Sequence, residues 1–483
     1  MSNDYLEGNF APVRREHTLT ELAVTGVIPA HLDGRYLRIG PNPIAEVDPE
    51  TYHWFTGDGM IHGVRLRDGK AQWYRNRWIR TPAVARALGE PTPRRAPSRT
   101  GLESFGANTN VLSHAGRTLA LVEAGVTNYE LTDELDTVGP CDFDGTLRGG
   151  YTAHPQRDPD TGELHAVSYS FGRGNRVQYS VIGVDGQARR TVDVEVTGSP
   201  MMHDFSLTEN HVVFYDLPVT FDPRQAAAIT VPRGLRAPAR LALSALIGRV
   251  RIPDPIRAMM GMAARGNALP YRWDPRYPAR VGVMPRTGGA GEVRWFDVEP
   301  CYVFHPLNAY DEGDSIVLDV VRHPKMFDTD FHGPNEGPTT LDRWTVDLAD
   351  GKVRETRLDD HSQEFPRIDD RLVGRRHRYG YAMQISSTGG IVGDSVLKHD
   401  LHRGQTSARR LGTHQRVGEF VFVPHSPQAP EDDGVLMGFV YDISTDHSNL
   451  TLLDATTLET IATIHLPTRV PYGFHGNWAP TTP

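Results

Sequence analysis

Short runs of β-branched and aromatic residues alternate with glycine-containing turns along most of the chain. Clear hairpins are predicted at residues 66–74, 111–122 and 346–354, each with an apolar run on both sides of a tight turn. The Asp-Gly pair within 184–187 adds to this, because Asp-Gly between apolar runs is a strong short-range hairpin signal. Helical periodicity is scarce, so the pattern predicts an all-β protein.

These hairpins recur at a loose distance before particular histidines. The turn that opens at Asp185 precedes His203 by 18 residues, and the turn at Thr287 precedes His305 by the same number. A repeating unit of strand, turn, strand and loop favours a β-propeller, in which the inner strand ends converge on one axis. From the pattern alone, a large β-sandwich remains an alternative.

Composition narrows the class of protein. The 483 residues include 51 Lys and Arg against 60 Asp and Glu, a net charge of −9, which disfavours nucleic-acid binding. No uninterrupted apolar run reaches the length of a membrane-spanning helix, and the polar, acidic N-terminus differs from a secretory signal. Cys141 and Cys301 are too few for a disulfide framework. We therefore expect a folded, cytoplasmic protein.

One segment departs from the β pattern. Residues 233–266 contain seven arginines and a single acid, Asp254, among many leucine, isoleucine and methionine residues. This composition predicts a basic, apolar, helical insertion, which we place at about 219–283. It could pack on the β core as a lid, or it could lie on an anionic lipid surface as a peripheral membrane contact.

Four histidines occur in similar local settings, each just past or between predicted strands. They are His154, His203, His305 and His475. In a radial fold such positions face the axis, so the four imidazoles could meet there and bind Fe, Zn, Cu or Ni. The chain has no G-x-S-x-G, P-loop, H-E-x-x-H or C-x-x-C motif, which removes several other chemistries.

Three glutamates lie in apolar strand contexts at matching places in the repeat. They are Glu123, Glu364 and Glu419. Four neutral imidazoles leave the charge of a metal ion uncompensated, and nearby carboxylates can orient the rings and hold their tautomers. The three glutamates are candidates for the carboxylates that orient these rings.

The chain resembles the carotenoid cleavage oxygenases, non-haem iron enzymes that split alkenes in carotenoids, apocarotenoids and stilbenoids. The resemblance runs nearly from end to end. It rests on the order and joint presence of the four histidine segments and of motifs at residues 34–43, 55–62, 107–110, 364–368, 431–434 and 473–478.

The resemblance implies a single catalytic domain over residues 1–483, a seven-bladed β-propeller with helical and loop insertions that cap the face where substrate enters. It implies Fe(II) held by the four histidines, with Glu123, Glu364 and Glu419 bonded to His203, His305 and His475 respectively. His154 is expected to lack a glutamate partner. It places Thr109 beside the open side of the iron.

The implied reaction is cleavage of a C=C bond with O2 to give two carbonyl products. An apolar conjugated alkene would reach the metal through a long apolar tunnel lined by aromatic residues near Phe304 and Phe474. In the stilbenoid-cleaving branch a lysine precedes the first glutamate, whereas Val122 stands here. We therefore favour a carotenoid or apocarotenoid substrate over a hydroxylated stilbene.

Other readings stay open at this point. A stilbenoid-cleaving dioxygenase or a retinoid-type isomerase would share the fold, and a propeller used only for binding would lack iron. A zinc hydrolase is disfavoured, because catalytic zinc commonly has three protein ligands and a water.

The 102 residues between His203 and His305 exceed the usual family spacing, and the excess coincides with the basic insertion. If this insertion docks on lipid, a polyene could pass from the bilayer to the tunnel.

Overall fold

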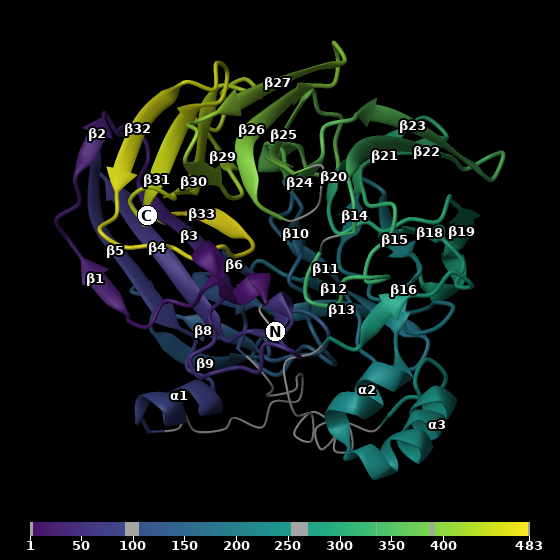
Figure 1. The fold of residues 1–483 in the computed structure, drawn as a ribbon. Coiled ribbons are helices and arrows are strands. Elements are labelled where there is room, and N and C mark those ends of the chain that lie inside the picture. Colours follow the sequence, from purple (N-terminus) through teal and green to yellow (C-terminus); the bar gives the residue numbers. More distant parts are fainter. Residues whose placement is uncertain (1–2, 92–105, 253–268, 335, 387–390, 482–483) are drawn as a thin grey trace.

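The computed structural model describes residues 3–91, 106–252, 269–334, 336–386 and 391–481. Its sheets follow one another around a ring in the order of the chain (Figure 1). Five sheets of four or five strands stand alone, and a ten-stranded sheet supplies two further groups joined through β28 (Gln415–Val417), which pairs with strands of both groups. These seven groups are the blades of a β-propeller, which confirms the predicted fold class.

The first three blades come from the N-terminal part of the chain and from its last strand. Blade 1 contains β1 (His17–Leu19), β3 (Gly34–Pro41), β4 (Gly59–Arg67), β5 (Lys70–Trp78) and β33 (Gly476–Pro480). Blade 2 contains β6 (Asn110–His114), β7 (Arg117–Leu121), β8 (Asn128–Leu131) and β9 (Thr137–Cys141). Blade 3 contains β10 (Gln156–Arg157), β11 (Leu164–Ser168), β12 (Arg176–Ile182) and β13 (Ala188–Glu195).

The remaining four blades continue around the ring. Blade 4 contains β14 (Phe205–Leu207), β15 (His211–Asp216), β18 (Arg280–Pro285) and β19 (Arg294–Asp297). Blade 5 contains β20 (Pro306–Glu312), β21 (Ser315–Arg322), β22 (Thr340–Asp347) and β23 (Lys352–Asp359). Blade 6 contains β24 (Gln363–Arg367), β25 (Tyr379–Ile385), β26 (Gly393–Asp400) and β27 (Gln405–Arg410). Blade 7 contains β2 (Val24–Gly26), β29 (Val421–Pro424), β30 (Gly434–Asp442), β31 (His447–Asp454) and β32 (Thr460–His465).

The predicted hairpins are present at the predicted turns. Asp68 and Gly69 have positive φ and connect β4 to β5, and Ala115 and Gly116 do the same between β6 and β7. Short turns of this kind need left-handed backbone conformations, which explains the Asp-Gly and Ala-Gly pairs at these places.

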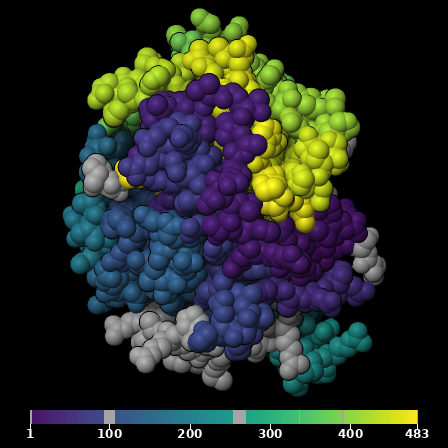
Figure 2. All heavy atoms as spheres, turned by 90° about the vertical axis from the view of Figure 1, so that its left-hand side faces the viewer, coloured from purple at the N-terminus to yellow at the C-terminus, as the bar shows by residue number. Residues whose placement is uncertain are grey.

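The two ends of the chain close the ring. The N-terminal strand β2 pairs with β32 of the last blade, and the C-terminal strand β33 pairs with β3 of the first blade. The N-terminal and C-terminal segments accordingly lie side by side on the surface shown in Figure 2. The ring therefore holds together only when segments more than 400 residues apart in the chain have paired.

Apolar side chains fill the spaces between blades. The largest cluster joins blades 3, 4 and 5, with Tyr179, Phe214 and Trp344 all fully buried within it. In each blade, one edge strand of the sheet lies nearest the axis, and we call it the inner strand. Inner strands of neighbouring blades contact each other, as β14 contacts β20 and β33 contacts β6. The inner strands line the axis, so residues that directly precede them meet at the centre of the ring.

The insertion between blade strands β15 and β18 contains most of the helix in the fold. It consists of the paired strands β16 (Val219–Phe221) and β17 (Tyr271–Trp273) with α2 (Pro223–Thr230) and α3 (Arg236–Leu246) between them. Helices α2 and α3 lie beyond the ring, as does α1 (Pro82–Leu88) (Figure 1). Residues 280–283 belong to blade strand β18, so the insertion ends before them. The part of the basic segment at 253–266 lies outside the described residues.

Short 3-10 turns complete the described elements. They are η1 (Asp4–Leu6), η2 (Gly8–Phe10), η3 (Trp54–Thr56), η4 (Arg233–Leu235), η5 (Ala290–Glu292) and η6 (Asp370–Leu372). Within the described ranges, no helix has the length and hydropathy needed to cross a bilayer.

We predict that closure of blade 1 is sensitive to a single methyl group. A Cβ at Gly34 would lie 2.6 Å from the Ala479 carbonyl oxygen, whereas one at Gly139 in β9 would meet no atom within 4 Å. Gly34→Ala should therefore destabilise the protein by about 1–3 kcal/mol, and Gly139→Ala should have little effect. The midpoint of urea denaturation measures the stability of each variant. Equal midpoints for Gly34→Ala and Gly139→Ala would contradict the role of β3 and β33 in closing the ring.

Candidate metal centre

Four buried histidines converge at the centre of the ring. Their candidate ligand nitrogens all lie within 4.8 Å of one another, and the four residues are His154, His203, His305 and His475. Each comes one or two residues before the inner strand of a blade, namely β10, β14, β20 and β33. Because these strands surround the axis, residues from four different blades meet although they are spread over 322 positions of the chain.

Backbone hydrogen bonds hold these residues in place. The Thr109 carbonyl oxygen accepts a bond from the His475 amide at 3.0 Å, and the His305 carbonyl oxygen accepts one from Val321 at 3.1 Å. The amide of His154 donates to the Thr152 hydroxyl at 3.1 Å. The rings are thus fixed by blade structure rather than by flexible loops.

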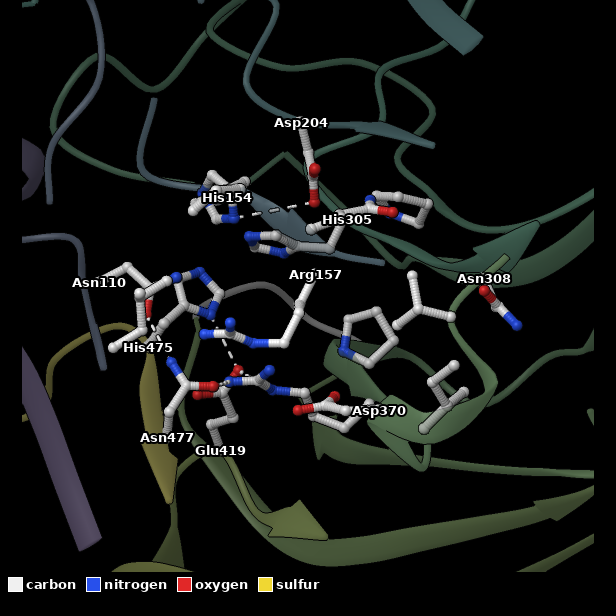
Figure 3. Close-up of a pocket in the computed structure, with 18 of the residues that line it drawn as sticks. Asn110, His154, Arg157, Asp204, His305, Asn308, Asp370, Glu419, His475 and Asn477 are labelled. Carbon is white, nitrogen blue, oxygen red and sulfur yellow. Dashed lines mark hydrogen bonds and ion pairs between the residues drawn. The ribbon is translucent and has the colours of Figure 1, made fainter. Parts of the chain in front are cut away.

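Three of the rings donate to carboxylates, of which Glu364 and Glu419 are buried and Glu123 is partly buried. His203 Nδ1 lies 2.9 Å from Glu123 Oε2, and His305 Nδ1 lies 2.6 Å from Glu364 Oε2. His475 Nδ1 lies 2.8 Å from Glu419 Oε1 (Figure 3). These are the same three pairs that the resemblance implies.

The carboxylates determine which nitrogen of each ring faces the centre. An ionised carboxylate only accepts hydrogen bonds, so Nδ1 of each paired ring carries the proton and Nε2 offers a lone pair. His203 Nε2 and His305 Nε2 lie 3.2 Å apart, and a cation between such nitrogens would relieve the repulsion of their lone pairs. His154 Nε2 is buried and has no hydrogen-bond partner among the described residues. The donor set therefore fits a metal ion.

Electrostatics favours the neutral state at two of the ligands. Burial and the three neighbouring imidazoles hold the pKa of His154 well below its ordinary value. Burial also lowers the pKa of His305 to about 4, although Glu364 opposes this. Burial alone would raise the pKa of Glu419, but Arg367 and His475 outweigh it and bring this pKa to about 2. At His203, burial lowers the pKa, but the Glu123 carboxylate outweighs it, so the pKa of this ring is raised.

Three residues of the site were not expected from the sequence. His323 Nε2 donates to Glu364 Oε1 at 2.7 Å, and Arg367 Nε donates to Glu419 Oε1 at 2.9 Å. Asp204 Oδ2 lies 3.7 Å from Nδ1 of His154, the ring that has no glutamate partner. Burial raises the pKa of Asp204 to about 7, so its charge is poorly compensated by the protein alone. Arg367 lies in the Glu364 motif and Asp204 follows a predicted ligand, but His323 carries no local sequence signal.

An apolar cavity of about 60 Å³ lies on one side of the histidines. Aromatic residues line it, among them Phe55, Phe304 and Phe474, together with Val122 and Thr109. The Thr109 hydroxyl donates to Asn108 at 2.9 Å, so this side chain presents no free donor to the cavity. The expected residues around Phe304 and Phe474 therefore do line an apolar space beside the site. The length of the expected tunnel stays a prediction.

A second cavity, of about 200 Å³, lies along the propeller axis on the other side. We call it the axial cavity, because the inner strands of blades 1, 2, 3, 5 and 6 contribute to its wall. Figure 3 shows its polar lining, with the His154–Asp204 and His475–Glu419 pairs marked. The four imidazoles would hold a metal ion beside this polar space.

Comparison with known proteins agrees with this geometry. Residues 10–480 match the family described as retinal pigment epithelial membrane protein. The chain is 63% identical to a carotenoid cleavage oxygenase of Mycobacterium tuberculosis, over 99% of this chain and 98% of that protein. It is 32% identical to carotenoid 9,10(9',10')-cleavage dioxygenase 1 of Arabidopsis thaliana, over 98% and 89% of the two chains.

Two solved structures have nearly the same fold as this chain. The lignostilbene dioxygenase of Pseudomonas brassicacearum superimposes with a TM-score of 0.81 at 26% identity, covering 99% of this chain and 98% of that one. The cobalt-substituted apocarotenoid oxygenase of Synechocystis gives a TM-score of 0.78 at 26% identity, with 97% of each chain covered. With its motifs in the same order and its match extending over nearly its whole length, this chain belongs to the carotenoid cleavage oxygenase family.

Proposed function

We propose that this chain is an Fe(II)-dependent oxygenase that cleaves a C=C bond of a carotenoid or apocarotenoid with O2 to give two carbonyl products. The observation that carries the proposal is a buried set of four histidines that opens onto an aromatic, apolar cavity. The relatives named as carotenoid-cleaving enzymes support the same reaction class.

His154, His203, His305 and His475 would hold the iron. Iron supplies the one-electron chemistry that lets O2 react with an alkene, which side chains alone do not provide. Glu123, Glu364 and Glu419 fix the orientation and tautomer of their rings.

Nearby carboxylates also suit a cation at this buried site. Glu364 and Glu419 are paired with His305 and His475, and Asp204 lies 3.7 Å from His154. A cation among them would offset negative charge that is costly in a low-dielectric interior.

The apolar cavity accounts for the substrate class. Val122 is buried and lines the cavity where a lysine would offer a charge to a phenol. Aromatic walls exclude water and hold a conjugated chain by apolar contact. Thr109 lines the cavity together with three of the histidines. The cleavage itself requires no general acid or base from these residues.

We also propose that α3 contacts an anionic membrane surface. Leu243 packs α3 against α2, while Leu241 on the opposite side of the helix is 68% exposed. Leu235 and Leu246 are exposed as well, and the exposed arginines around them are Arg233, Arg236 and Arg240. An exposed apolar face with a basic rim fits the interface of an anionic bilayer. A carotenoid dissolved in that bilayer would then lie close to the enzyme.

The function is tested by supplying iron-loaded protein with carotenoids, apocarotenals and stilbenes. We expect O2 uptake and two carbonyl products, identified by mass, from a polyene substrate. His305→Ala should lose iron binding and turnover, because one of four ligands is gone. His165→Ala, at a buried histidine outside the site, should keep near-stoichiometric iron. Full activity of His305→Ala, or ester hydrolysis without O2 uptake, would overturn the proposal.

The glutamate role predicts a charge effect on metal affinity. Glu123→Gln keeps the size and an acceptor for His203 Nδ1 but removes the negative charge. We expect iron affinity to fall about 10–100-fold. Glu431→Gln is the matched control, because Glu431 accepts only the amides of Arg378 and Tyr379 among the described contacts. Equal affinities of the two variants in a chelator competition would contradict this role.

The membrane contact predicts a local effect of charge on vesicle binding. Leu241→Glu should weaken co-sedimentation with anionic vesicles, because burial of one leucine contributes about 1.5–3 kcal/mol. Val27→Glu changes an equally exposed residue in another part of the surface and should bind as the unaltered protein does. Unchanged sedimentation of Leu241→Glu would exclude α3 as the contact.

A further inference from the structure

The four histidines separate two cavities of opposite character. His203 lines the apolar cavity but not the axial cavity, and His154 lines the axial cavity but not the apolar one. His305 and His475 line both. A metal ion at this centre would therefore face an apolar space on one side and a polar space on the other.

The axial cavity has room for water and for a hydrated ion. Its volume of about 200 Å³ corresponds to several water molecules, which occupy about 30 Å³ each in the liquid. Its wall carries the amides Asn110, Asn308, Asn477 and Gln156 besides its charged groups. Such side chains can replace water molecules around a cation one at a time. The apolar cavity has no comparable set, so a hydrated ion would lose its water there without replacement.

Two further carboxylates line the axial cavity, and neither is bonded directly to an arginine among the described contacts. Glu419 is paired with Arg367, and the guanidinium of Arg157 donates to the carbonyl oxygens of Ser113 and Gly162. The Asp370 side chain faces the cavity without a direct hydrogen bond or ion pair among the described contacts, although the charges of Arg367 and Arg157 act on it. Asp204 lies deeper, is only 8% exposed, and approaches His154 (Figure 3).

His154 links this cavity to the metal ligands. Its Nε2 atom is buried without a hydrogen-bond partner, and the ring as a whole is 7% exposed. It is the only one of the four rings whose nearest carboxylate, Asp204, lies on the axial side and beyond hydrogen-bond distance. Of the three imidazoles that line the axial cavity, His154 is thus the one that no glutamate has engaged.

We propose that the axial cavity is the path by which an aqueous divalent cation reaches the four histidines, with Asp370 and then Asp204 as the carboxylates along it. This path is separate from the apolar cavity that takes the alkene. The inference rests on the metal ligation proposed above and assigns a role to residues that the cleavage reaction does not use.

The test measures the rate at which metal-free, full-length protein takes up Co(II), followed by its absorbance after rapid mixing. Val373 lines the axial cavity and is half-buried, so Val373→Trp should obstruct it. We expect uptake to slow about tenfold or more, because entry then requires the chain to move, while the final stoichiometry is unchanged. Val293→Trp adds the same bulk at a half-buried site away from both cavities and should leave the rate unaltered.

A second variant tests the charge without adding bulk. Asp370→Asn should slow uptake about two- to threefold and reduce its dependence on ionic strength, because an attractive charge near the path is lost. Asp350→Asn, on an exposed hairpin turn far along blade 5, is the control. This arm decides the question if Val373→Trp does not fold.

A third variant separates the two cavities. Leu269→Trp narrows the apolar cavity and should lower alkene cleavage while leaving Co(II) uptake at the rate of the unaltered protein. Normal uptake by both Val373→Trp and Asp370→Asn, or slowed uptake by Leu269→Trp instead, would overturn the axial path. If the unaltered protein binds no Co(II), the ligand assignment fails instead, so the two failures are distinguishable.

Discussion

Three buried carboxylate–imidazole hydrogen bonds connect different blades at the centre of the ring. Glu123 follows a strand of blade 2 and reaches His203 before blade 4, while Glu364 of blade 6 reaches His305 before blade 5. Glu419, two residues before β29 of blade 7, reaches His475, which directly precedes β33. Buried charges are tolerated only when they are paired and hydrogen-bonded. The site and the closure of the ring therefore depend on each other at the Glu419–His475 pair: without β33 in blade 1, Glu419 would lose this imidazole partner.

This arrangement explains why the centre can be both rigid and reactive. The rings are held from behind by carboxylates and from the side by backbone hydrogen bonds, so little reorganisation is needed when a metal ion binds. The inner strands supply much of the polar wall of the axial cavity. The loops that precede them supply much of the aromatic wall of the apolar cavity. One propeller thus offers a polar and an apolar environment on the two sides of the same four-histidine cluster, which suits a hydrated metal ion and an apolar alkene respectively.

The added segment between β15 and β18 leaves this centre undisturbed. It leaves blade 4 after β15 and returns before β18, and those two strands pair directly. The extra length between His203 and His305 is therefore accommodated outside the ring, where α2 and α3 lie (Figure 1). A propeller tolerates such insertions because each blade is stabilised by its own ladder and by its two neighbours.

Local signals in the sequence determined the strands, because turn residues and alternating apolar runs act over a few positions, and the predicted hairpins are present. The four histidines and three glutamates could be named from motifs whose order matches a known family. Only the tertiary structure decided which residues touch. His323 and Glu364 are 41 positions apart, and Asp204 approaches a ring 50 positions away. No local pattern encodes such contacts, since they arise when the ends of the chain pair and bring seven blades around one axis.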